Sequence, residues 1–256
     1  MLGSVHLVDG GVRSSTRWLR RAPAVGDTAG LRHAQMVVAA PLGGRPPAPQ
    51  LGRFGLVAFW DDEGSLDRFL ETHPMAGVLA GGWSVRLDPL RAVPVASSHF
   101  PGVPDDLPVA VSANDQGPVA VLTIGRLRLW RAPTFFRTSS RAERQAIDAA
   151  GLLWGTGLAN VTQRVVSTFS LWRSASEMRD YAASAGRHAD AIRAEKTRSF
   201  HHAGSFVRFR PRAAQGHLTG RNPLPEELAR DLDGDDLGAP SGSAADLGSA
   251  DDTPVG

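Results

Sequence analysis

The stretch RFGLVAFWDDEGSLDRFLETHP, residues 53–74, carries the pattern that decides the fold. An apolar run ends at Trp60, and Leu66 and Phe69 follow it six and nine positions later. The stretch VVSTFSLWRSASEMRDYAAS, residues 165–184, repeats the arrangement, with Met178 and Tyr181 at the same two spacings after Trp172. Both stretches therefore predict a strand that ends at a tryptophan and leads into an amphipathic helix.

Two further pairs of segments flank these stretches in the same order. Val85-Arg86-Leu87-Asp88-Pro89 is similar to Val207-Arg208-Phe209-Arg210-Pro211, and the glycine-containing segment before Leu31 is similar to Gly155-Thr-Gly-Leu. Similar segments in a fixed order indicate an internal duplication, here with a unit of about 95 to 105 residues.

Each unit is predicted to contain strand, helix, strand, strand, helix and strand. The expected strands are residues 4–8, 31–40, 53–60 and 83–88 in the first unit, and 119–130, 152–162, 165–172 and 205–210 in the second. The expected helices are 14–21, 65–72, 133–150 and 174–196, the last one opened by the capping box Ser174–Glu177. The fold class is therefore α+β, with two tandem ferredoxin-like βαββαβ repeats whose bare sheet faces pack on each other or on a second subunit.

Composition divides the chain into four parts. Residues 1–98 form the first repeat, 99–118 a proline-rich linker, 119–224 the second repeat, and 225–256 a disordered acidic tail. The tail is expected to be disordered because it is rich in Asp, Gly, Ser, Ala and Pro and contains no aromatic residue.

Charge and composition exclude several classes of protein. The net charge is +2, but residues 226–256 contain nine acidic residues and one basic residue, which leaves a net charge of +10 on the rest. Those basic residues are scattered and, apart from Lys196, are all arginines, so we do not expect a nucleic-acid interface. The absence of cysteine excludes disulfides, thiolate ligands and iron–sulfur clusters. No apolar run is long enough to span a bilayer and the N-terminus lacks the features of a signal peptide, so a cytoplasmic protein is expected.

A spaced pattern in the second unit resembles the bacterial spheroidene monooxygenases. The matching positions are Phe169-Ser170-Leu171-Trp172, Met178, His188 with Ala191-Ile192-Arg193, Phe206-x-Arg208-Phe209, and Gly216-His-Leu-x-Gly220-Arg-Asn-Pro223-Leu224. The resemblance covers residues 119–224 and is weak over the first 95. The chain departs from the family at Ser199–Gly204, where His201-His202 stands in place of an acidic pair.

This resemblance implies a fold, an activity and a cofactor. The fold is that of the dimeric α+β-barrel superfamily. The activity is a haem-dependent oxidation of an apolar, carotenoid-like polyene by dioxygen, with electrons from an external reductant such as ferredoxin. An apolar small molecule and an electron-donor protein are thus the expected partners, whereas a homodimer and peripheral membrane contact stay open. A non-catalytic ligand- or haem-binding barrel and a cofactor-free oxygenase of the same superfamily are the alternatives.

Two residues are candidates for holding the haem, and no catalytic residue is assigned. His188 matches the helix histidine of the family and lies at the edge of the apolar stripe of its helix, which makes it the candidate axial and metal ligand. Arg208 matches a family arginine, and its guanidinium suits a haem propionate. The competing interpretations are a surface histidine and a structural arginine.

The remaining histidines receive other interpretations. His73 is expected at a helix end, where it favours the dipole, and His201, His202 and His217 are expected in loops. Trp172 and Tyr181 are expected in the core. Hydrolase and P-loop motifs are absent, and Gly155-Thr-Gly157 lacks the third glycine of a dinucleotide-binding fingerprint.

Overall fold

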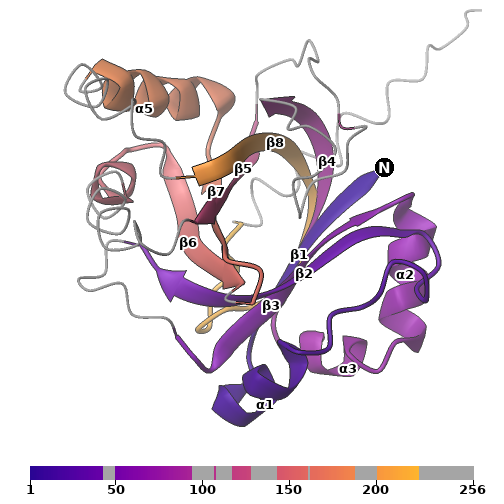
Figure 1. Ribbon diagram of the computed structural model, residues 1–256. Coiled ribbons are helices and arrows are strands. Elements are labelled where there is room, and N and C mark those ends of the chain that lie inside the picture. The colour runs from indigo at the N-terminus through magenta and orange to yellow at the C-terminus, as the bar shows by residue number, and fades with distance from the viewer. Residues whose placement is uncertain are drawn as a thin grey trace, which may run out of the picture.

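The eight strands of the computed structural model close into one antiparallel barrel (Figure 1). The structure describes residues 1–42, 50–93, 107, 117–127, 143–160, 162–187 and 201–224. Around the barrel the strands follow the order β1-β3-β2-β6-β7-β5-β8-β4. Their bounds are β1 Leu2–Asp9, β2 Leu31–Pro41, β3 Arg53–Trp60, β4 Trp83–Val93, β5 Val119–Leu127, β6 Leu152–Asn160, β7 Val165–Trp172 and β8 His201–Gly216.

Both halves of the barrel have the same internal strand order. The first four strands are arranged β4-β1-β3-β2 and the last four β8-β5-β7-β6, and the halves join through β2–β6 and β4–β8. Trp60 pairs with the first residues of β1 and β2, and Trp172 pairs with the first residues of β5 and β6. This common register is what an internal duplication predicts. The sheet faces pack on each other within one chain, so barrel closure needs no second copy.

The barrel interior is a packed core built by alternate residues of the strands. Val57 and Phe59 of β3 point inward, as do Phe169 and Leu171 of β7 and Val207 and Phe209 of β8. The predicted alternation in the last strand is thereby confirmed, because Val207 and Phe209 share the inner face. Leu107, from the predicted linker, is also buried in this core.

Helices cover the outer face of the first half on one side of the barrel (Figure 1). They are α1 Gly11–Trp18, α2 Glu63–Thr72 and α3 Ala76–Leu79. Leu66 and Phe69 of α2 pack on Trp60, whose ring lies 5.0 Å from that of Phe69. This outer layer is closely packed, with Leu56, Leu66 and Met75 completely buried.

In the second half, α5 Ala175–Arg187 covers β7, and residues 143–147 are helical. Trp172 stacks on Tyr181 at 5.0 Å, which matches the pairing of Trp60 with Phe69. Ser174 Oγ accepts from the Glu177 amide at 3.2 Å, which confirms the N-cap half of the predicted capping box. The Glu177 carboxylate accepts from the Ser174 hydroxyl at 3.1 Å rather than from the backbone amide that a capping box uses.

Several predicted boundaries were wrong. The first helix begins at Gly11 rather than at Ser14 or Ser15, because Ser15 Oγ donates to the carbonyls of Val12 and Leu51 instead of capping. Helix α2 begins at Glu63 rather than at residue 65, because the Asp62 side chain accepts from the Ser65 amide and caps it. The short helix α3 was not predicted. Strands β4 and β8 run past Pro89 and Pro211, where register shifts lie beside the prolines. The acidic tail lies outside the described residues.

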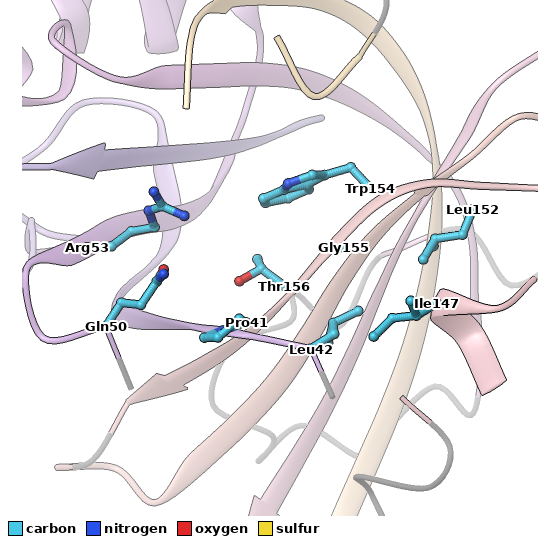
Figure 2. Close-up of a pocket in the computed structure, with 9 residues that line it drawn as sticks. All are labelled: Pro41, Leu42, Gln50, Arg53, Ile147, Leu152, Trp154, Gly155 and Thr156. Atoms are coloured by element: carbon cyan, nitrogen blue, oxygen red, sulfur yellow. The ribbon is translucent and has the colours of Figure 1, made fainter. Parts of the chain in front are cut away.

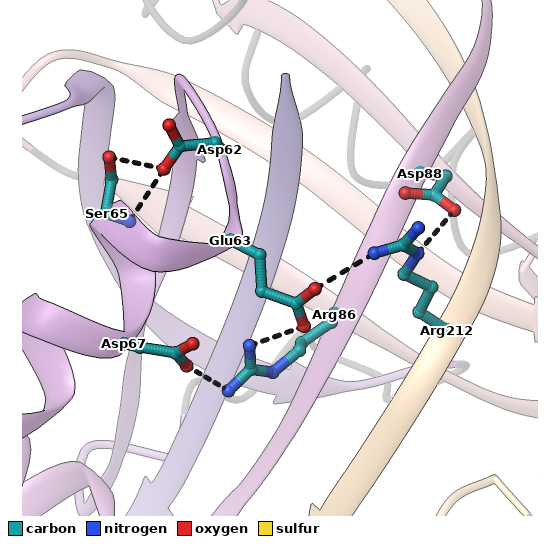
Figure 3. Close-up of polar contacts among 7 residues, drawn as sticks. All are labelled: Asp62, Glu63, Ser65, Asp67, Arg86, Asp88 and Arg212. Carbon is teal, nitrogen blue, oxygen red and sulfur yellow. Dashed lines mark hydrogen bonds and ion pairs between the residues drawn. The ribbon is translucent and has the colours of Figure 1, made fainter.

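Ion pairs connect the two halves at the β4–β8 joint (Figure 3). Glu63 of α2 accepts from Arg86 of β4 at 2.7 Å and from Arg212 of β8 at 3.0 Å. Asp67 accepts from Arg86 at 2.6 Å, and Asp88 accepts from Arg212 at 3.0 Å. Glu63 thus ties a helix of the first half to a strand of the second.

Candidate functional site

A cavity of about 240 Å³ lies between the outer face of β5, β7 and β8 and the helices that cover it. Its apolar lining comes from strands, helices and the residue that follows β2: Leu42, Val121, Ala146, Trp172, Met178, Ala182 and Phe206. Its polar lining consists of Thr123, Glu143, Thr168, Ser170 and Tyr181. We call this space the α5 cavity.

Alternation along the strands explains why these side chains reach the cavity. On β7, Phe169 and Leu171 point into the barrel core, so Thr168, Ser170 and Trp172 point outward. On β5, Leu122 and Ile124 fill the core, and Val121 and Thr123 face the cavity. The capping box fixes where α5 begins, which places Met178, Tyr181 and Ala182 on the face toward the sheet.

Two aromatic residues form one wall of the α5 cavity. Trp172 donates from Nε1 to Ser170 Oγ at 2.9 Å and stacks on Tyr181 with an interplanar angle of 29°. Burial raises the pKa of the Tyr181 phenol, and the nearby Glu143 carboxylate raises it further. The phenol therefore keeps its proton at neutral pH. Trp172 belongs to a buried cluster against which Tyr181 packs, as expected, and both residues also line the cavity.

Arg208 lies on the same sheet face as this site but does not line the cavity. It occupies the outer face of β8 and pairs in register with Val121 of β5, two residues along from the pair Phe206 and Thr123 of the cavity wall. Its side chain is buried, with 8% of the residue exposed. A guanidinium held next to an apolar cavity is able to bind a carboxylate there. Arg210, by contrast, is exposed.

His188, the candidate axial ligand, lies outside the described residues, directly after the end of α5 at Arg187. The prediction of loops for His201 and His202 was wrong, since their backbones belong to β8 and His201 pairs with Leu127. His217 follows β8 outside any strand, as expected.

His73 caps the C-terminus of α2 in a different role from the one predicted. Its Nδ1 accepts from the Met75 amide at 3.1 Å, and its ring stacks on Phe69 at 4.6 Å. Desolvation lowers its pKa, so it acts as a neutral acceptor rather than as a cation at the helix dipole.

Sequence reasoning did not single out His6, which is buried, or His33, which is half-buried. His6 of β1 is 3% exposed, and burial, assisted by the charge of Arg86, lowers its pKa to about 4. Burial alone lowers the pKa of His33 of β2 to about 4. The alternation of β1 was the available signal for His6, because Leu2, Ser4, His6 and Val8 share a face. Neither residue lines the α5 cavity.

Among the described residues, no group of three or more His, Asp or Glu side chains is arranged to hold a metal ion. Within the same part of the chain, no helix is both long enough and apolar enough to cross a bilayer.

Comparison with known proteins adds a relative that covers most of the chain. The spheroidene monooxygenase of Rubrivivax gelatinosus is 30% identical over 200 residues, which are 78% of this chain and 75% of that protein. The chain belongs to the spheroidene monooxygenase family. The spheroidene monooxygenase of Cereibacter sphaeroides is 24% identical over 190 residues, 72% of this chain and 57% of that protein. The family members to which the chain is similar are thus named as monooxygenases.

Comparisons at the level of family models and solved structures are less informative. No family model matches the chain. An aldoxime dehydratase crystallised with butyraldoxime aligns with a TM-score of 0.48 and 11% identity, over 82% of this chain and 79% of that one. A heme-degrading enzyme from Listeria monocytogenes aligns with a TM-score of 0.29 and 12% identity, over 81% and 99% of the two chains. Scores this low do not establish a common fold.

Proposed function

We propose that this chain is a monooxygenase that oxidises a linear, apolar, carotenoid-like polyene with dioxygen at a haem bound in the α5 cavity. The observation that carries the proposal is the cavity itself, an apolar and aromatic space with a buried arginine on the same sheet face. The corresponding outer face of the first half is filled by Leu66, Phe69 and Met75. Membership of the spheroidene monooxygenase family supports the reaction class and the substrate class.

The residues that line the α5 cavity fit a porphyrin in their chemistry. Val121, Met178 and Phe206 offer apolar contact, and Trp172 with Tyr181 offers a flat aromatic wall. Arg208 supplies a cation for a propionate. The volume of about 240 Å³ is below the roughly 300–1,000 Å³ of small-molecule sites. Residues 128–142, which follow β5 in the sequence, and residues 188–200, which follow α5, lie outside the described part of the chain.

His188 is the candidate for the axial position. It stands seven residues after Tyr181, a spacing that returns to the same face of a helix. With no cysteine in the chain, an imidazole nitrogen is the ligand that the proposal requires.

A bound haem would supply the activation of dioxygen, with electrons from a ferredoxin-type donor. The chain's own residues would shape the site around it. Trp172, Met178 and Phe206 exclude water and hold an apolar substrate, which strengthens electrostatic interactions inside the cavity. Arg208 neutralises a propionate charge. Tyr181, a phenol whose pKa burial and Glu143 raise further above neutral pH, is a hydrogen-bond donor in the wall.

Haemin titration of the purified full chain, followed by absorbance, tests the cofactor. The wild type should give a sharp Soret band at one haem per chain. His188→Ala should abolish that band or move it to a weakly bound form, whereas His217→Ala, at an exposed position, should leave it unchanged. The absence of haem binding by the wild type would remove the cofactor and favour the cofactor-free oxygenase or the binding protein.

Substitution of two neighbouring alanines on α5 tests both catalytic turnover and the position of the proposed site. Ala182 and Ala183 are both exposed, but only Ala182 lines the cavity. Ala182→Phe should weaken haem binding and lower the rate of oxygenated product formation from an acyclic carotenoid, because the added ring occupies the cavity. Ala183→Phe should change neither. Equal effects of the two variants would contradict the proposed site.

A further inference from the structure

Helix α1 has a basic outward face. Arg13 and Arg17 lie four positions apart on the helix, and Arg20 lies in the turn directly after its end, so the three side chains share one face. All three are exposed, and none forms an ion pair with another residue that the structure describes. Ser15 is buried and Trp18 packs on the outer layer of the first half, so the opposite face of α1 is the one held on the barrel. Figure 1 shows α1 at the lower end of the molecule, away from α5.

The sequence around this face contains no acidic residue that offsets its charge. Residues 10–26 include four arginines and neither Asp nor Glu. Asp9, directly before this segment, already accepts from Arg53 Nε and Nη2, both at 2.7 Å. Figure 2 shows Arg53 lining a separate cavity of about 220 Å³ at the start of β3, on the same side of it as Gln50. Arg53 therefore neutralises Asp9 without joining the exposed face, and the charge of the α1 arginines remains.

Two exposed apolar side chains lie next to the basic face. Val12 of α1 is 55% exposed and Leu51, in the loop before β3, is 56% exposed. Ser15 Oγ donates to the backbone carbonyls of both residues, which holds the loop against the first turn of the helix. We call Val12, Leu51 and the three arginines the α1 surface. Arginines with exposed apolar side chains among them are the composition of a surface that enters the headgroup layer of an anionic membrane.

A cavity of about 210 Å³ lies between α1 and the turn that joins β6 to β7. It is lined by Thr16, Leu19, Arg20, Val38, Asn160 and Thr162. Both hydroxyl groups already donate elsewhere, Thr16 to the Val12 carbonyl at 2.9 Å and Thr162 to Asn160 Oδ1 at 2.7 Å. The Arg20 guanidinium is thus the donor that the cavity offers to a ligand, and it suits the phosphate of a lipid headgroup.

We propose that the α1 surface binds the protein to an anionic phospholipid bilayer. The three arginines contact lipid phosphates, with Arg20 holding one at the mouth of its cavity, and Val12 and Leu51 enter the headgroup layer. A nucleic acid backbone would match the charges but offers no apolar counterpart for these two side chains, whereas the headgroup layer accepts both. Docking of this kind needs neither haem nor substrate, so it is independent of the proposed function.

Sedimentation of the full chain with vesicles tests the charge of the α1 surface. In about 0.1 M salt the protein should bind vesicles of phosphatidylcholine with about 30% phosphatidylglycerol but not phosphatidylcholine alone, and about 1 M salt should release it. Arg17→Gln should weaken binding about fivefold, and the triple variant R13Q/R17Q/R20Q about 100-fold. The control triple R68Q/R91Q/R221Q removes the same charge from exposed positions elsewhere and should stay within about twofold of the wild type.

Insertion of Leu51 is tested with a single fluorophore, because the chain contains no cysteine. Leu51→Cys, labelled with an environment-sensitive dye, should emit at shorter wavelength when anionic vesicles are added. The same dye on Thr72→Cys, at the exposed end of α2, should not respond. The proposal is overturned if the full chain does not bind anionic vesicles, if the two triple variants lose binding equally, or if the two dyes respond alike. Failure of haem binding leaves all three of these results unaffected.

Discussion

At the scale of single residues, His6 shows what the barrel imposes on an ordinary side chain. It lies on the outer face of β1 beneath the helices of the first half, close to Arg86 of β4. Burial is the larger cause and the arginine charge the smaller one of the shift of its pKa to about 4. The protein therefore holds His6 neutral at pH values where an exposed histidine is protonated.

Stability should consequently fall as the pH drops from about 6.5 to about 4. In that range His6 binds a proton in the unfolded chain but not in the folded chain, so acid favours unfolding. A pKa shift of this size lowers the free energy of unfolding by up to about 3 kcal/mol. Above pH 6.5 His6 is neutral in both the folded and the unfolded chain, so its ionisation no longer lowers the free energy of unfolding. Denaturant unfolding between pH 4 and 8 measures the slope.

His6→Leu should reduce this acid dependence without abolishing it. His33, whose pKa burial lowers to about the same value, contributes in the same range and stays in the variant. His217→Leu, at an exposed position, should preserve the slope of the wild type. An unchanged slope in His6→Leu would mean that His6 is protonated in the folded protein.

At the scale of elements, the two helix caps offer a matched pair. Ser174 caps α5 over the cavity, and Asp62 caps α2 over the packed face of the first half. Ser174→Ala should lower the free energy of unfolding by about 1 kcal/mol and also weaken haem binding, because the first turn of α5 carries Met178 into the cavity wall. Thermal unfolding and haemin titration measure the two effects.

Asp62→Ala should destabilise the protein but leave haem affinity unchanged, since α2 does not line the α5 cavity. If both variants weaken haem binding to the same extent, the loss reflects global stability, and α5 has no special part in the site.

At the scale of the whole molecule, the joint between β4 and β8 depends partly on Glu63. Glu63→Gln removes the charge that attracts Arg86 and Arg212. Both pairs are partly exposed, so the loss should total about 1 kcal/mol, a decrease of a few degrees in Tm. Glu71→Gln, on the same helix, is the control. A loss above about 3 kcal/mol would mean that the ion pairs decide whether the barrel closes.

The acidic tail gives a second prediction at this scale. Deletion of Glu226–Gly256 should leave Tm within about two degrees of the wild type, because a segment of this composition contributes little packing. Calorimetry of the shortened and full chains decides this. A large decrease would show that the tail packs on the barrel.

Much of the second half could be predicted from the sequence, because the signals there are local. The bounds of β3 and β7 agree with prediction, since alternating apolar residues mark both strands up to a tryptophan. The capping box located the start of α5 because its bonds join residues three positions apart. The family pattern pointed to Arg208, which the structure buries on the outer face of β8, the face that carries Phe206 of the cavity wall. Length, composition and the spacing of apolar residues thus determined the α+β class and the existence of most elements.

Only the tertiary structure decided how these elements combine. Closure through β2–β6 and β4–β8 pairs residues more than 100 positions apart, and no local pattern encodes that distance. The α5 cavity depends on side chains from three strands and two helical segments meeting on one face, together with Leu42, which follows β2. The pKa of His6 likewise depends on helices packed over β1. Propensity and periodicity act over a few residues, whereas burial and cavity shape arise from contacts that exist only after the chain has closed.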